Sequence, residues 1–467
     1  MKNLPLIIAV LLSVAAYVGL GYYTVRTDFT QFISLLLLLY GLYWIIYKCT
    51  LTSEDLTFSI GAAIAFRVVL LFVLPHLSDD YFRFYWDGQL LANGISPFAY
   101  LPSEFISGSQ VEHGIAALNE SLFNKLNSPE YFTIYPPVCQ FVFWLGAKIF
   151  PNDIYGAVVL MKSCMLLFEI GSIYFIKKLI DHFGLIKRFV LVYALNPLVI
   201  LELTGNLHFE GAMICFSLMA VWLLVKNNWV GSAVAMALAV CSKLLPLIFL
   251  PFLLKRLRVK SIPYYAIVGV VSLVLFLPLF NVSIIQNLGS SIDLYFQKFE
   301  FNASVYYIVR EVGFWVKGWN IIETAGPYLA GFTFVGIMFL ALFEKTMSER
   351  HMLYFMMMAL TIYLLFATIV HPWYVTPLIA FCVFSQYRYS VLWSALIAFT
   401  YYTYTTDAYI ENMWIVGVEY FLVIGFGIYE YFCHKSTRQK YLDRIVAMEE
   451  SCLFSGHDFY QEDLTKD

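Results

Sequence analysis

Two adjacent carboxylates, Asp79 and Asp80, have the type and spacing in this chain that best suit chemistry. They follow an apolar segment long enough to cross a membrane and open the stretch SDDYFRFYWDGQLLANGISPFAY. A carboxylate within hydrogen-bond reach of a hydroxyl can act as a general base, and adjacent acids can also hold a hard divalent cation. We expect one of them to be catalytic, against the alternative that both are simply solvated at a helix end.

An aromatic cluster surrounds these acids and includes Tyr81 and Trp86, with Arg83 and Asp87 among the rings. Aromatic side chains combine a flat apolar face with a polar edge, which suits both a membrane interface and the C–H face of a sugar. An interfacial belt accounts for some of the rings but not for the acids. The composition of the stretch therefore favours a binding site.

Five ionisable residues lie inside apolar segments: Arg67, Lys162, Glu169, Glu202 and Lys243. Such groups are costly at membrane depth unless they are paired or wetted, so each is a functional candidate. The alternative is internal ion pairing, which is as well supported for Lys162 and Glu169, seven residues apart on one helical face. We expect Lys243 to bind an anionic ligand. The alternative is that its ammonium pairs with the carboxylate of Glu202.

Two short motifs between apolar segments add further candidates. The stretch NLHFEG at 206–211 offers His208 and Glu210 in one tight turn, and HPWY at 371–374 offers His371, which could donate to a phosphate. A histidine in a loop often has no special role, and Trp373 could belong to an aromatic belt. We find no glycine-rich phosphate loop and no Cys/His metal pattern, and metal use stays open.

The composition of the chain indicates whether these residues lie in water or in a membrane. The 467-residue chain is 61% hydrophobic and 13% charged, and its mean hydropathy is +0.73. A soluble protein would carry about a quarter charged residues, so the sequence predicts an all-α polytopic membrane protein. The eight cysteines are scattered and indicate neither a disulfide framework nor a metal site.

The hydropathy pattern predicts about 12–14 membrane spans. They are expected near 4–24, 30–48, 57–76, 155–176, 188–204, 207–225, 229–254, 261–280, 327–344, 351–370, 372–386, 390–406 and 412–432. Basic clusters at 177–188 and 255–260 should face the cytoplasm. The segment 77–135 carries seven acids against two bases and should lie outside.

Two segments do not fit a simple count of spans. The run 136–150 is short and begins with two prolines, so we expect a helix lying in or dipping into the outer interface. The stretch 229–254 has basic residues on the same side at both ends and holds Lys243 and Pro246 near its middle. A broken pair of short helices fits it better than a straight span, because unwound backbone at membrane depth must line a cavity or be buried in protein.

The chain is expected to form one membrane domain, residues 1–433, followed by a cytoplasmic tail, residues 434–467. Large external loops at 77–135 and 281–327 would hold any chemistry, together with the helices beneath them. No soluble catalytic domain is expected, because the tail is short and polar.

The stretch with the two acids resembles the first external loop of the GT-C glycosyltransferases, in the branch of bacterial mannosyltransferase-like proteins. Further similar motifs are TIYPP at 133–137, NPLVILELTGNLHFEGAM at 196–213, SKLLPL at 242–247 and HPWYV at 371–375. A departure is SPF at 96–98, where the family often has Asn-Pro before the aromatic residue. The similarity covers the chain from about residue 60 to residue 380.

This resemblance implies an inverting transfer of a hexose, mannose first, from a polyprenyl-phosphate donor to a glycan or lipid hydroxyl at the periplasmic face of a bacterial inner membrane. An acid of the first external loop, Asp79 or Asp80, would be the base. Lys243, Arg83 and His371 would hold the phosphate. Contacts with sugar or acceptor are expected from Tyr81, Trp86, Asp87, Tyr135, His208, Glu210, Trp373 and Tyr374. A transporter or lipid flippase is the alternative, although we see no internal repeat.

Overall fold

The computed structural model describes residues 3–107, 114–406 and 408–455 and is built from helices, which confirms the predicted all-α class. Within these ranges the extended pairing is a single bridge between Phe301 and Ile369. The N-terminal part contains α1 (Leu4–Tyr22), α2 (Phe29–Cys49), α3 (Ser53–Leu71), α4 (Asp80–Ala92), α5 (Pro102–Ile106), α6 (Glu120–Phe123), α7 (Pro137–Ile149) and α8 (Ile154–His182).

Shorter and bent helices follow in the middle of the chain. They are η1 (Lys187–Phe189), α9 (Val190–Ala194), α10 (Pro197–Val199), η2 (Ile200–Gly205), α11 (Glu210–Val225), α12 (Trp229–Val240), η3 (Leu245–Phe249), α13 (Pro251–Leu257), η4 (Arg258–Lys260), α14 (Ser261–Phe276) and η5 (Leu277–Leu279).

The remaining helices complete the bundle. They are α15 (Ile284–Gln297), α16 (Val305–Lys317), α17 (Ile322–Phe343), α18 (Glu349–Phe366), η6 (Pro372–Val375), α19 (Thr376–Cys382), α20 (Tyr389–Leu396), η7 (Ile397–Thr405) and α21 (Met413–Ser455).

Six helical segments in the described residues are long and apolar enough to cross a membrane by themselves, and a bent pair at 187–205 would make a seventh. The six lie at 4–22, 29–49, 154–182, 251–279, 322–343 and 413–435. Most other predicted spans are present as shorter or interrupted helices, such as α11 and α12. A helix needs about 20 apolar residues to span a bilayer. The protein is therefore an integral membrane protein whose helices are of very uneven length.

The expected break in the segment 229–254 is present. Helix α12 ends at Val240, a turn carries Lys243, and the chain resumes as the 3₁₀ helix η3, which begins at Leu245. Pro246 suits this position because proline is tolerated in the first turn of a helix, where its missing N–H has no partner to lose. The break places a charged side chain at a helix end inside the bundle.

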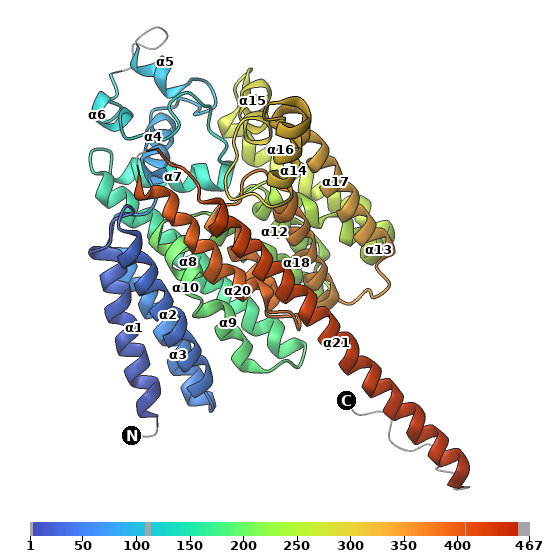
Figure 1. The fold of residues 1–467 in the computed structure, drawn as a ribbon. Coiled ribbons are helices and arrows are strands. Elements are labelled where there is room, and N and C mark those ends of the chain that lie inside the picture. The colour runs from blue at the N-terminus through green and yellow to red at the C-terminus, as the bar shows by residue number, and fades with distance from the viewer. Residues whose placement is uncertain (1–2, 108–113, 407, 456–467) are drawn as a thin grey trace.

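The short run after Pro136 forms α7, a helix of 13 residues. That length covers about 20 Å at 1.5 Å per residue, less than the hydrocarbon core of a bilayer. Helix α7 lies beneath α4 and crosses the direction of the long helices (Figure 1). Its length agrees with the expectation of a helix that does not span.

The two predicted external segments lie at one end of the bundle, where α4 to α6 and α15 to α16 meet (Figure 1). Two hydrogen bonds connect them, from Asn287 Nδ2 to Phe98 O at 2.8 Å and from Ser291 Oγ to Phe132 O at 3.0 Å. A third, from Ser96 Oγ to Leu279 O at 2.7 Å, joins the first segment to η5, directly before the second. The N-terminus lies at the opposite end (Figure 1). Both segments therefore form one cap over the long helices.

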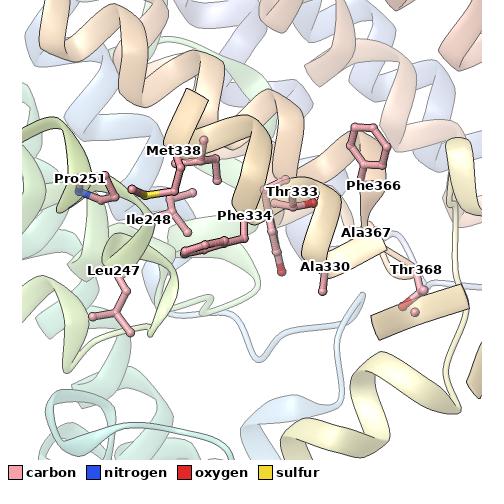
Figure 2. A pocket seen from close by; sticks show the side chains of 13 residues that line it. Leu247, Ile248, Pro251, Ala330, Thr333, Phe334, Met338, Phe366, Ala367 and Thr368 are labelled. Carbon is pink, nitrogen blue, oxygen red and sulfur yellow. The ribbon is translucent and has the colours of Figure 1, made fainter. Parts of the chain in front are cut away.

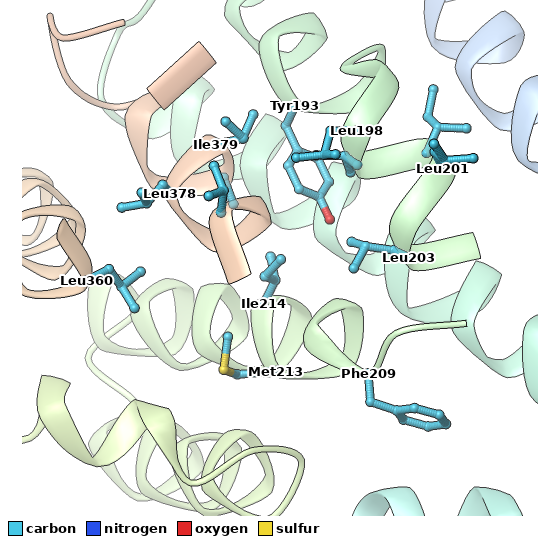
Figure 3. Packing of buried hydrophobic residues seen from close by; sticks show 14 of the residues in the cluster. Tyr193, Leu198, Leu201, Leu203, Phe209, Met213, Ile214, Leu360, Leu378 and Ile379 are labelled. Carbon is cyan, nitrogen blue, oxygen red and sulfur yellow. The ribbon is translucent and has the colours of Figure 1, made fainter. Parts of the chain in front are cut away.

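The core beneath this cap is packed from short helices. Figure 3 shows Tyr193 of α9, Leu203 of η2, Ile214 of α11 and Leu378 of α19 converging on one apolar cluster, and all four are fully buried. Dense packing of this kind fixes helix ends to within small tolerances. It therefore gives the turn between η2 and α11 a rigid base.

Candidate active site

Asp79 and Asp80 stand at the start of α4, at the lower edge of the cap. The carboxylate of Asp79 pairs with Arg26 at 2.8 Å, and its side chain is 41% exposed. Asp80 is more enclosed, with its side chain 20% exposed. Its oxygens accept hydrogen bonds from Asn127 Nδ2 at 2.7 Å and from the Tyr135 hydroxyl at 3.4 Å.

These environments separate the two acids chemically. The guanidinium of Arg26 occupies one of the oxygens of Asp79 in a charge-assisted contact. Asp80 has neutral amide and phenol donors and lies 4.0 Å from Nδ1 of His208. A carboxylate that is partly enclosed but not paired to a fixed cation is better suited to accept a proton. The geometry favours Asp80 over Asp79 as the base.

Behind Asp80, His208 connects the cap to the membrane helices. Its Nε2 lies 3.4 Å from a carboxylate oxygen of Glu202, which is fully buried. Its ring stacks on Trp373, with centroids 3.7 Å apart. His208 and Trp373, predicted from two separate motifs, are thus brought together beside Asp80.

Lys243 at the broken helix forms an ion pair with Glu210 in the first turn of α11. The prediction that Glu202 is the competing partner of Lys243 is wrong. The Glu202 carboxylate lies beside His208 and accepts a hydrogen bond from the Tyr401 hydroxyl at 2.9 Å. The Lys243 ammonium also lies 5.2 Å from the ring centre of Tyr374, within cation–π range. The carboxylate of Glu210 is almost fully enclosed, whereas the Lys243 side chain is 25% exposed.

A cavity of about 370 Å³ opens beside this pair. Tyr135, Glu210, Lys243 and Tyr374 line its polar end, and apolar side chains of η3 and α18 line the rest. Because Tyr135 also donates to Asp80, the cavity and the carboxylate share one wall.

A second, apolar cavity of about 340 Å³ continues from the first, since Leu247, Ile248, Tyr363, Ala367 and Thr368 line both. Figure 2 shows side chains of η3 and α13 on one side of it and those of α17 on the other. Together the two cavities form a groove that we call the bipartite groove, defined by the lining residues Lys243, Ile248, Ala330, Phe334 and Thr368.

Arg83, Trp86 and Asp87 lie apart from this groove. Arg83 donates to Asp87 at 2.8 Å and to the carbonyl of Ser128 at 2.8 Å, and its side chain is 4% exposed. Trp86 is buried among rings of the cap, including Phe105. Their hydrogen bonds and packing hold the loop 123–131 on α4. Their predicted contacts with phosphate or sugar stay predictions that this geometry does not support.

Tyr81 is also largely buried, and its ring packs on that of Phe82 with centroids 4.1 Å apart. Removal from water raises its pKa to about 12. The phenol is therefore neutral at physiological pH and can act as a hydrogen-bond donor. It borders Asp80 in sequence but does not line the groove.

His371 stands in the turn before η6, with its ring on Trp373 at 4.4 Å and near Phe301 at 4.9 Å. Removal from water, with smaller contributions from His208 and Lys243, lowers its pKa to about 3. The imidazole is therefore neutral at physiological pH. It can donate one N–H to a phosphate but brings no positive charge, and its buried Nδ1 has no hydrogen-bond partner.

The other intramembrane charges are structural. Arg67 pairs with Glu169 at 2.5 Å, both side chains being fully buried. Lys162 donates to the backbone carbonyls of Leu70 and Val73, at 2.9 and 2.5 Å, where α3 ends. Lys162 and Glu169 do share one helix, but they serve different partners. The ion-pairing alternative is thus confirmed for Glu169, with Arg67 as the partner.

Sequence reasoning did not identify Arg26, Asn127 and Tyr401, which contact Asp79, Asp80 and Glu202. These residues lie in three distant segments with no local motif, so a single sequence carries no signal for them. Among the residues that the structure describes, no group of three or more His, Cys, Asp or Glu side chains could hold a metal ion.

Comparison with known proteins gives one family. Residues 10–257 match the family described as "Alpha-(1->6)-mannopyranosyltransferase, N-terminal domain". Alpha-(1->6)-mannopyranosyltransferase A of Mycobacterium tuberculosis is 26% identical over 243 residues, covering 50% of this chain and 45% of the relative. The protein of the same name from Corynebacterium glutamicum is 23% identical over 207 residues, covering 44% and 39%.

The matched region thus spans less than half the length of these curated relatives. The family match covers more than half of this chain and contains the two acids, the NLHFEG turn and Lys243. The resemblance to GT-C mannosyltransferases is thereby confirmed. The chain belongs to the alpha-(1->6)-mannopyranosyltransferase family.

Proposed function

We propose that this protein transfers mannose from a polyprenyl-phosphate-linked donor to a hydroxyl of a glycan or lipid acceptor. The observation that carries the proposal is the position of Tyr135 between Asp80 and the bipartite groove. Tyr135 donates to Asp80 at 3.4 Å and also lines the cavity that holds Lys243. Tyr135 therefore connects the candidate base to the cavity that holds the candidate phosphate-binding group.

The chemistry follows from these positions. Asp80 takes the proton of the acceptor hydroxyl, and the oxygen attacks C1 of the mannose from the face opposite the phosphate. The bond between C1 and the phosphate oxygen breaks, and its electron pair leaves with the polyprenyl phosphate. Direct displacement inverts C1. General-base assistance of this kind contributes on the order of a hundredfold or more to the rate.

Lys243 would hold the phosphate at the polar end of the groove. Its ammonium is partly exposed to the cavity and can approach a phosphate oxygen while it stays near Glu210. Charge-assisted hydrogen bonds are stronger than neutral ones. Neutral His371 could add one N–H from the side of Trp373. The polyprenyl chain would follow the apolar continuation between η3 and α17.

The cap would face the periplasm of a bacterial inner membrane. The basic clusters at 177–188 and 255–260 favour a cytoplasmic position for the opposite end. Hydrogen bonds between the segments 77–135 and 281–327 are consistent with their lying on one side. Acceptor and lipid donor would then meet at the outer leaflet.

Purified protein in detergent, given radiolabelled polyprenyl-phosphate mannose and an alkyl α-mannoside acceptor, tests the proposal. We expect labelled product without a sealed vesicle, which excludes a pure transporter. Asp80→Asn should remove most of the transfer, on the order of a hundredfold, and Asp79→Asn should remove less, because its carboxylate is paired with Arg26. Transfer at the wild-type rate by Asp80→Asn would show that the base is another group.

A further inference from the structure

A chain of polar side chains runs from the candidate base into the core of the bundle. Asp80 Oδ2 lies 4.0 Å from His208 Nδ1, and His208 Nε2 lies 3.4 Å from Glu202 Oε2. Exposure of the side chains falls along it, from 20% at Asp80 to 3% at His208 and 0% at Glu202. Neither separation qualifies as a hydrogen bond, and catalytic hydrogen bonds often tighten only with substrate bound.

Glu202 is held rigidly at the inner end. Tyr401 donates to one of its oxygens at 2.9 Å and Asn206 donates to the other at 3.0 Å. Both donors are neutral, and His208 Nε2 lies 3.4 Å from the same fully buried carboxylate. A buried carboxylate is costly without a compensating charge. A proton that moves onto His208 would therefore face this carboxylate.

The backbone around this pair has unusual local geometry. Glu202 lies in the π-helical turn η2, a rare form that is frequent at functional sites. Leu207, directly before His208, adopts the left-handed conformation with φ of 63°, which is uncommon for residues other than glycine. Because such geometry must be held by its surroundings, it indicates that the position of His208 is specifically maintained.

The ring of His208 is fixed from a third side. Trp373 stacks on it at 3.7 Å with an interplanar angle of 16°. The stacking fixes the orientation of the ring, and because an indole face attracts a cation, the contact stays favourable when the ring takes up a proton. His208 Nε2 is buried without a hydrogen bond, and the polar atom of an ionisable group that it faces is Glu202 Oε2 at 3.4 Å.

We infer that His208 and Glu202 are positioning residues that act through Asp80 and receive its proton. This inference rests on the proposed function. The neutral ring directs Nε2–H at Glu202 and presents the lone pair of Nδ1 to Asp80. When Asp80 has taken the proton of the acceptor hydroxyl, the proton moves on to Nδ1. Asp80 is then a carboxylate again, and the imidazolium stands between two carboxylates until it loses the proton to water.

Steady-state kinetics of the full chain in detergent, with polyprenyl-phosphate mannose and an alkyl α-mannoside, tests this relay. His208→Ala and Glu202→Gln should each lower kcat by about tenfold or more, as part of the roughly 10²–10⁴-fold that proton transfer contributes. KM for both substrates should change by less than about threefold, under half a logarithmic unit of affinity. Added imidazole should restore part of the rate of His208→Ala, since it can occupy the space left by the ring.

His351→Ala is the matched control, because His351 contacts Ser348 at the start of α18 and lies outside the active site. Its rate should be unchanged with or without imidazole. His208→Gln preserves bulk and guards against misfolding of the Ala variant, and it should be as slow as His208→Ala while melting like the wild type.

Three results would overturn the relay. They are an unchanged kcat in Glu202→Gln, a rise in KM alone, and a loss of rate in His208→Ala that imidazole does not reverse. Absence of mannosyl transfer by the wild type would instead overturn the proposed function. These failures are distinguishable because the wild-type assay precedes the variants.

Discussion

Asp79 and Asp80 are neighbours in sequence, but the structure gives them different electrostatic surroundings. One has a guanidinium partner at 2.8 Å and the other has neutral donors and an imidazole. The start of a helix explains the difference, since successive side chains there diverge by about 100°. Adjacent acids therefore need not share a function.

Substitutions can separate the two roles considered for Lys243, namely binding the donor phosphate and stabilising the fold through its ion pair with Glu210. Lys243→Met leaves the enclosed carboxylate of Glu210 without its partner, which should lower the free energy of unfolding by about 3 kcal/mol, the low end for a buried pair because Lys243 is partly exposed. The double variant Lys243→Met/Glu210→Gln should recover most of that stability, because no charge is then stranded. Melting curves in detergent, recorded beside a titration with polyprenyl-phosphate mannose, measure both quantities.

If Lys243 holds the phosphate, donor affinity stays weak in the double variant although stability returns. Glu210→Gln alone is the control, since it keeps the ammonium in the cavity. Full recovery of donor affinity in the double variant would contradict the phosphate role and leave Lys243 as a packing residue.

His371 should make stability depend on acid pH. Its pKa falls from about 6.5 to about 3 on folding, so the unfolded chain binds one more proton between these values. Its contribution to stability is complete above pH 6.5 and is lost progressively as the pH falls toward 3. His371→Phe should show a weaker decline of melting temperature over this interval than the wild type. Parallel declines in both proteins would refute this assignment.

At the scale of elements, the uneven lengths of the helices create the site. The break between α12 and η3 places the Lys243 ammonium inside the bundle. The bent segment 187–205 places the Glu202 carboxylate there. Irregular backbone at this depth is tolerated where it lines a cavity. The interruptions in the spans and the position of the groove thus have one physical cause.

If the polyprenyl chain lies in the groove between η3 and α17, blocking this groove should weaken binding of long-chain donors more than of short-chain donors. Ala330 lines its apolar part, so Ala330→Phe should obstruct the lipid. Loss of even two buried methylene groups would cost about 1.6 kcal/mol, or roughly tenfold in affinity. KM should rise for a long polyprenyl donor and little for a short-chain analogue.

Gly331→Phe is the matched control one residue along α17. A side chain there meets open space, so the same bulk points away from the groove. Equal effects of both substitutions on the long-chain donor would argue against this path for the lipid.

At the scale of the whole molecule, one end is the cap and the other carries the basic clusters. Ser121→Cys in α6 and Lys345→Cys before α18 report on the two ends, in a protein whose Cys433 and Cys452 are replaced by Ser. An impermeant thiol reagent should label Ser121→Cys in cells with a permeabilised outer membrane and should not reach Lys345→Cys. The reverse pattern would invert the topology and contradict a periplasmic active site.

The sequence by itself determined the membrane class, the helical architecture, the break near Lys243 and the short helix after Pro136. Each depends on local properties, namely runs of apolar residues, basic clusters and prolines, which act over one or two helical turns. It also gave Asp80, His208, Lys243 and Trp373 as candidates, mainly because ionisable residues within or directly beside apolar segments are costly and therefore rare.

Only the tertiary structure decided which of these residues meet. Lys243 pairs with Glu210 rather than Glu202, Arg83 closes a loop instead of lining the groove, and Arg26 separates Asp79 from Asp80. Partners of this kind come from helices far apart in the chain and are selected by packing, so no local pattern encodes them. The physical reason is that hydropathy depends on residues close together in the sequence. Charge pairing and cavity shape depend instead on residues that are close together only in the folded structure.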